Sequence, residues 1–199
     1  MPQSVIRRAF AAGQLEFGES YLQEATAKIF AMRDLPITWH FIGPIQSNKT
    51  ALIAENFSWV HSVDRQKIAE RLSAARPENL PPLNVCIQIS SGEASKGGIA
   101  PSELAALAAA IVALPRLKLR GLMTIPAPTN DVQKQRETFR SIRLLLEALN
   151  QAGFDLDTLS MGMSDDLDSA IAEGATIVRI GTAIFGPRDQ GKPGNIVSD

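Results

Sequence analysis

Val178-Arg-Ile-Gly-Thr-Ala-Ile-Phe-Gly186 is the stretch of sequence that decides the fold. Its apolar residues predict a buried strand over about 177–185 that runs into a glycine-lined turn. Gly181 and Thr182 offer backbone N–H groups and a hydroxyl, which can hold a phosphate without a formal charge. The segment Thr158-Leu-Ser-Met-Gly-Met-Ser-Asp-Asp166 repeats this layout one βα unit earlier. Two neighbouring strand ends aimed at one phosphate are typical of the last strands of a βα barrel.

Three residues in these segments have two possible roles each. Arg179 lies in an apolar run, and its guanidinium needs an anion, a ring nitrogen or an interior acid as a partner. Ser164 can donate to a phosphate, or it can simply cap a helix predicted over 164–173. Thr182, with Gly181, can complete a phosphate site, or the pair can serve close packing in a barrel strand.

Short apolar runs alternate with helical periods along the whole chain. We expect helices at about 3–12, 20–33, 47–55, 64–76, 101–114, 131–152 and 164–173. We expect strands at about 15–18, 37–43, 59–63, 84–90, 117–125, 157–163 and 177–185. Seven strands with a helix at the start predict a (β/α)₈ barrel of the TIM type whose first strand is missing. The alternative is a doubly wound sheet, but no G-x-G-x-x-G follows an early strand. Residues 1–189 are expected to form a single domain, with a loose tail over 190–199.

Composition excludes several classes of protein. The 199 residues carry a net charge of −1, which gives no footprint for nucleic acid or for a membrane surface. The longest apolar run, 104–114, is too short to span a bilayer. Cys86 is the only cysteine, so we expect no disulfide and a reducing cytoplasm. His40 and His61 lack a metal or triad signature and are expected in the core.

Six ordered motifs resemble one family, the pyridoxal phosphate homeostasis proteins (YggS/PROSC-like). They cover roughly residues 3–189 and are Phe17-Gly-Glu-Ser-Tyr-Leu-Gln-Glu24, Trp39-His-Phe-Ile-Gly-Pro-Ile-Gln-Ser-Asn-Lys49, Val60-His-Ser-Val-Asp64, Gly121-Leu-Met-Thr-Ile-Pro126, Leu159-Ser-Met-Gly-Met-Ser-Asp-Asp166 and Val178-Arg-Ile-Gly-Thr-Ala-Ile-Phe-Gly186.

The resemblance implies a barrel similar to the N-terminal domain of alanine racemase. It implies a protein that binds pyridoxal 5′-phosphate (PLP), has no established reaction, and acts in vitamin B6 and amino-acid balance. We also expect a monomer whose partners are PLP and PLP-dependent apoenzymes. The residues that the resemblance places at the cofactor are Ser164, Arg179, Gly181, Thr182, Met163, Ser20, His40 and Met123.

The chain departs from the family pattern at several places, of which two bear on the cofactor most directly. The family lysine that bonds PLP lies on a first strand ahead of the helix over 3–12, and we expect this chain to start after it. Ser20 stands where the family usually has asparagine. Among the lysines present, Lys49 and Lys96 follow strands, whereas Lys28 is expected as a solvated charge on a helix.

Three other functions remain open. A PLP-dependent racemase or decarboxylase would need a second domain to bring an acid or base across the site. A different barrel enzyme acting on a phosphorylated metabolite would need a carboxylate or lysine base at a strand end. A truncated remnant that no longer binds PLP is the third.

Overall fold

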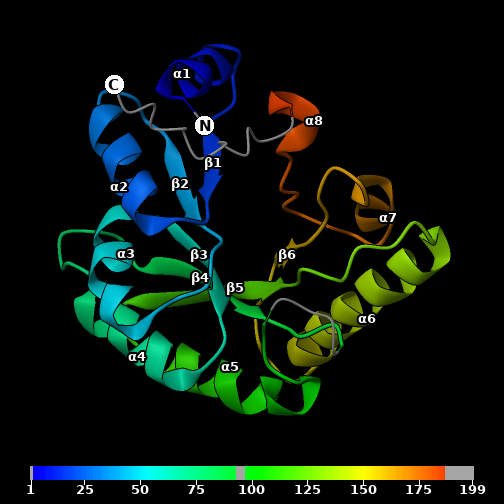
Figure 1. Ribbon diagram of the computed structural model, residues 1–199. Helices are drawn as coiled ribbons and strands as arrows, with labels where there is room; N and C mark the ends of the chain where they lie inside the picture. The colour runs from blue at the N-terminus through cyan, green and yellow to red at the C-terminus, as the bar shows by residue number, and fades with distance from the viewer. Residues whose placement is uncertain (1, 93–96, 187–199) are drawn as a thin grey trace, which may run out of the picture.

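A computed structural model describes residues 2–92 and 97–186 of the chain. It contains a parallel sheet of six strands in the order β1-β2-β3-β4-β5-β6, so each strand pairs with its neighbour in sequence. The sheet curves, and helices surround its outer side (Figure 1). A strand order that never reverses belongs to a βα barrel, whereas a doubly wound sheet reverses at its switch point. The predicted barrel type is therefore confirmed as a parallel half-barrel.

Most predicted elements lie within a few residues of their expected bounds. The strands are β1 Glu16–Glu19, β2 Thr38–Phe41, β3 Trp59–Val63, β4 Leu83–Gln88, β5 Leu117–Met123 and β6 Thr158–Ser160. The α-helices are α1 Gln3–Ala11, α2 Leu22–Ala31, α3 Thr50–Asn56, α4 Gln66–Ala75, α5 Leu104–Val112, α6 Val132–Gln151, α7 Leu167–Ala172 and α8 Thr182–Phe185. Two 3₁₀ turns, η1 Ser47–Lys49 and η2 Pro101–Glu103, precede α3 and α5.

The predicted seventh strand over 177–185 is wrong. The chain pairs with β6 only briefly, through an isolated bridge between Ser160 and Ile177, and through the Arg179 amide, which donates to the Gly162 carbonyl at 2.9 Å. It then turns at Gly181 into helix α8. Val178 is 36% exposed and Ile184 is 64% exposed, so this segment is not buried on both faces. A short apolar run fits one helical turn as well as a strand, and periodicity cannot separate the two.

Close approach of β5 and β6 depends on one glycine. A Cβ atom at Gly121 would lie 1.8 Å from the Thr158 carbonyl oxygen, so no other residue fits this backbone. Helix α6 then covers this pair of strands, with Phe139 and Ile142 buried in the core. Its start is fixed by Asp131, whose carboxylate accepts from the amides of Gln133 and Lys134.

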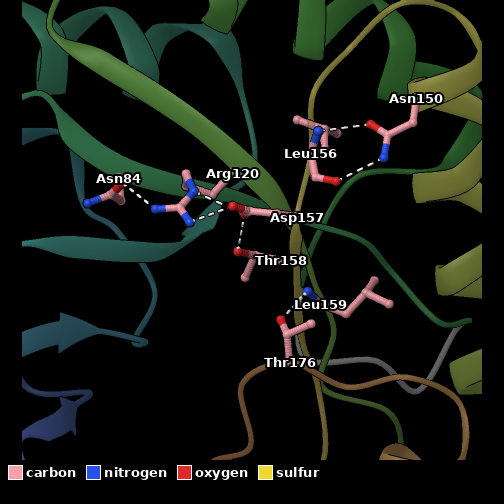
Figure 2. A network of polar contacts seen from close by, with 8 residues as sticks. All are labelled: Asn84, Arg120, Asn150, Leu156, Asp157, Thr158, Leu159 and Thr176. Atoms are coloured by element: carbon pink, nitrogen blue, oxygen red, sulfur yellow. Dashed lines mark hydrogen bonds and ion pairs between the residues drawn. The ribbon is translucent and has the colours of Figure 1, made fainter.

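Polar contacts fix the start and the middle of β6 (Figure 2). Before the strand, the Arg120 guanidinium donates to both carboxylate oxygens of Asp157, at 3.0 and 2.6 Å. Within it, the Leu159 amide donates to the Thr176 hydroxyl at 2.8 Å. The second contact joins β6 to the segment that follows α7, so the residues after Thr176 run beside the carboxyl end of β6.

Candidate functional site

The carboxyl ends of β5 and β6 and the segment 176–179 meet at one place. Gly162, just past β6, has a φ of +93°, and a Cβ there would lie 2.5 Å from the Ala170 Cβ in α7. Only glycine allows this turn, because a side chain would be strained and would clash. The turn carries the chain from Ser160 to Ser164.

Ser164 faces the start of α8. Its hydroxyl oxygen accepts from the Ala183 amide at 3.3 Å, and Gly181 is the N-cap residue of that helix. Helix α7 begins later, at Leu167, with Asp166 in the N-cap position, so the alternative in which Ser164 caps this helix is wrong. The predicted phosphate residues Ser164, Gly181 and Thr182 are therefore brought together, with Gly181 and Thr182 exposed and Ser164 half-buried.

Arg179 lies next to this group and has no carboxylate partner among the described residues. Its guanidinium donates to the Ser160 hydroxyl oxygen at 2.7 Å and to the Thr124 carbonyl oxygen at 2.8 Å. Burial lowers the pKa of Arg179 to about 10, and the nearby Asp166 carboxylate opposes this shift. The guanidinium is thus a cation at neutral pH, and the alternative of a structural ion pair does not apply within residues 2–92 and 97–186.

A line of hydrogen bonds continues from Arg179 into the barrel. Ser160 Oγ lies 2.7 Å from His61 Nδ1, and His61 Nε2 lies 2.9 Å from His40 Nδ1. The His40 ring stacks on Trp59 with ring centroids 5.5 Å apart, and the Arg120 guanidinium lies 4.7 Å from the Trp59 ring centroid. These contacts form a continuous polar column from Arg120 to Arg179.

Both histidines of the column are neutral at neutral pH. Burial lowers the pKa of His40 from 6.5 to about 4. Burial lowers the pKa of His61 well below its usual value, and the charges of His40 and Arg179 lower it further. A neutral imidazole has one donor and one acceptor nitrogen, which suits a line of single hydrogen bonds.

The remaining predicted cofactor residues differ in their access to a ligand. Met163 is 36% exposed beside Ser164, and Ser20 is half-buried just after β1. His40 and Met123 are buried, the latter completely. Their contact with PLP stays a prediction.

One lysine, Lys28, lies in a different environment from the one predicted. Lys28 was predicted as a solvated charge, but it is buried and forms an ion pair with Glu19 at 2.6 Å. Lys28 lies on the face of α2 that also carries the buried Ala25, and its ammonium donates to Glu19 at the end of β1. Lys49 is half-buried at the end of η1, and Lys96 lies outside the described residues.

Sequence reasoning missed Ser160 and Thr124 as the acceptors of Arg179. His61 and Ser160 are 99 positions apart in the chain, so no local pattern joins them. Ser160 lies inside a recognised motif, and that is the only signal that could have found it. In the described part of the chain, no group of three or more His, Cys, Asp or Glu residues is placed to hold a metal ion. The same residues include no helix with the length and apolarity needed to cross a bilayer.

Comparison with known proteins agrees with the motif resemblance. The family model of the alanine racemase N-terminal domain matches residues 3–189. The pyridoxal phosphate homeostasis protein of Pseudomonas aeruginosa is 62% identical over 193 residues, which are 96% of this chain and 83% of that protein. PipY of Synechococcus elongatus, solved with PLP bound, is 39% identical with a TM-score of 0.87, over 93% of this chain and 88% of PipY. Alanine racemase of Corynebacterium glutamicum, 19% identical, shares the fold with a TM-score of 0.72, over 94% of this chain and 52% of the racemase.

The buried neutral histidines predict a loss of stability in mild acid. An unfolded histidine takes up a proton near its ordinary pKa of 6.5, whereas folded His40 does so only near 4. The unfolded state therefore binds more protons in this window, and the free energy of unfolding falls as the pH drops below about 6.5. We expect a fall of up to about 1.4 kcal/mol per pH unit for each such histidine.

Urea unfolding at about pH 7 and about pH 5.5 measures this slope. The variant His40→Asn keeps a polar group near Nδ1 but does not titrate, so its slope is expected to be shallower. Equal slopes for the two proteins would show that His40 is not buried in its neutral form.

Proposed function

This chain belongs to the pyridoxal phosphate homeostasis protein family, and we propose that it binds PLP at the carboxyl ends of β5 and β6 without catalysing a reaction. The observation that carries the proposal is Arg179, a half-buried cation without a carboxylate partner, next to the hydroxyls and amides of Ser164, Gly181 and Thr182. The ring nitrogen of PLP can accept from Arg179, and its phosphate can bind the hydroxyls and amides of the other three residues. The residues present therefore fit this cofactor.

The phosphate is held by Ser164, Gly181 and Thr182. Support comes from the Ser164 hydroxyl, which already lies within hydrogen-bond distance of an amide at the start of α8. A phosphate between these groups would accept from both the hydroxyl and the free amides of the first helical turn. The Asp166 carboxylate is turned towards the Met163 amide, from which it accepts at 2.6 Å.

The pyridine nitrogen faces Arg179. Two of the five guanidinium N–H groups are used by Ser160 and Thr124, so donors remain for a ring acceptor. Bound PLP supplies an electron sink for amino-acid chemistry, and this sink is strongest when the ring nitrogen is protonated. A guanidinium that donates to that nitrogen keeps it unprotonated, which supports a carrier over a catalyst.

The wider role is to buffer PLP and deliver it to PLP-dependent apoenzymes, in vitamin B6 and amino-acid balance. Residues 1–189 act as one domain and as a monomer, in the cytoplasm. Cys86, the only cysteine, is free and buried, as a reducing compartment allows. A racemase would need an acid or base beside the cofactor. Tyr21, the sole tyrosine, is 62% exposed at the start of α2 and does not support that alternative.

Replacing Thr182 by valine tests the phosphate contact separately from the contacts to the rest of the ligand. The hydroxyl is lost while the branched shape of the side chain is kept, so we expect PLP to bind roughly tenfold more weakly, the value of one charge-assisted hydrogen bond. Pyridoxal, which lacks the phosphate, should bind nearly as before. Absorbance titration measures both affinities. Thr182→Ser keeps the hydroxyl and is the matched control. An equal loss for both ligands would place the phosphate elsewhere.

The proposed absence of catalysis is tested with amino acids. The purified chain, saturated with PLP, is incubated with a panel of L-amino acids, and racemisation and decarboxylation are followed by chiral chromatography. We expect rates equal to those of free PLP, because Arg179 weakens the electron sink. A rate many-fold above this background would overturn the proposal in favour of an enzyme.

A further inference from the structure

The Ser160 hydroxyl has one proton to donate, and its two neighbours decide where that proton goes. Arg179 Nη1 and His61 Nδ1 each lie 2.7 Å from Ser160 Oγ. A guanidinium only donates, so the hydroxyl oxygen accepts from Arg179. The hydroxyl proton is then available for His61 Nδ1, which must be an unprotonated acceptor.

This choice sets the tautomer of both histidines. If His61 accepts at Nδ1, its proton is on Nε2 and is donated to His40 Nδ1, 2.9 Å away. His40 then carries its own proton on Nε2. In the opposite direction, His40 would donate to His61 and His61 to Ser160, and the hydroxyl proton would find no acceptor within the described residues. The direction from Arg179 towards His40 therefore leaves fewer buried polar atoms without a partner.

The far end of the line is consistent with this direction. His40 Nε2 is buried without a hydrogen-bond partner and lies 4.0 Å from a carboxylate oxygen of Glu16. A nitrogen that carries a proton is attracted by that carboxylate, whereas a lone pair would be repelled. The stacked Trp59 ring holds the imidazole in this orientation.

We propose that Ser160 and His61 are positioning residues, which hold the Arg179 guanidinium at one orientation through a directed line of hydrogen bonds ending at His40. The inference rests on the proposed function, because it names what aims Arg179 at the pyridine nitrogen. Arg179 has a long side chain with large rotamer entropy and lies beyond the last backbone bridge of the sheet. Without fixed acceptors it would sample many orientations, and few of them would meet a ring nitrogen.

The line of hydrogen bonds requires a neutral His61. A protonated His61 would lose the acceptor that Ser160 needs and would add a second cation near Arg179. Burial and the Arg179 charge both keep the pKa of His61 low, so the acceptor is retained at neutral pH.

The first test needs no ligand. Nitrogen-15 NMR of the full chain should show His61 protonated at Nε2 and unprotonated at Nδ1. The Arg179 guanidinium should rotate slowly in the wild type and rapidly in Ser160→Ala. Ser169→Ala is the matched control, because Ser169 is also buried and donates to a side chain, Gln135 Oε1, at 2.7 Å. Protonation of His61 at Nδ1, or equal guanidinium rotation in Ser160→Ala and wild type, would overturn the inference.

The second test compares PLP with 1-deaza-PLP, in which carbon replaces the ring nitrogen. In Ser160→Ala we expect the affinity for PLP to fall roughly tenfold and that for the analogue to change less than about twofold. Equal losses for the two ligands would mean a general structural role and would also overturn the inference. If the wild type bound neither ligand, the proposed function would fail, while the NMR result would still decide the positioning role.

Discussion

The guanidinium of Arg179 keeps its positive charge in every condition under which the protein works, and the fold must provide acceptors for it where the chain leaves β6. Those acceptors are the Ser160 hydroxyl and the Thr124 carbonyl, which stand at the carboxyl ends of adjacent strands. Their spacing depends on the close approach of β5 and β6 at Gly121. A feature of the backbone core therefore determines the geometry of the exposed site.

The two arginines at opposite ends of the polar column differ in their hydrogen-bond partners: Arg120 forms an ion pair, and Arg179 does not. Arg120 is neutralised by Asp157, 2.6 Å away, and its guanidinium also lies against the Trp59 ring. This hydrogen-bonded ion pair raises the pKa of Arg120 and lowers that of Asp157. Arg179 has only uncharged acceptors among the described residues. Buried guanidinium donors without an acceptor are costly, and a ligand with a ring acceptor would satisfy those that Ser160 and Thr124 leave over, which is the physical basis for placing the cofactor there.

The alternating pattern of the sequence predicted the fold type, because strands and helices differ in apolar period and most elements are long enough to show it. The error fell on 177–185, where a few apolar residues around Gly181 form half an extended segment and half a helical turn. Ser164, Gly181 and Thr182 were predicted from local chemistry at strand ends, and the structure brings them together. The line from Ser160 to His40 was beyond prediction, because it depends on the register of strands far apart in sequence.

The most direct measurement of the central claim is a crystal structure of this chain grown with PLP. The account predicts the phosphate between the Ser164 hydroxyl and the amides at the start of α8, with the pyridine nitrogen within hydrogen-bond distance of the Arg179 guanidinium. Arg179 should still donate to Ser160 and Thr124. A bound PLP whose ring nitrogen faces a carboxylate, or whose phosphate lies away from Ser164 and Thr182, would contradict it.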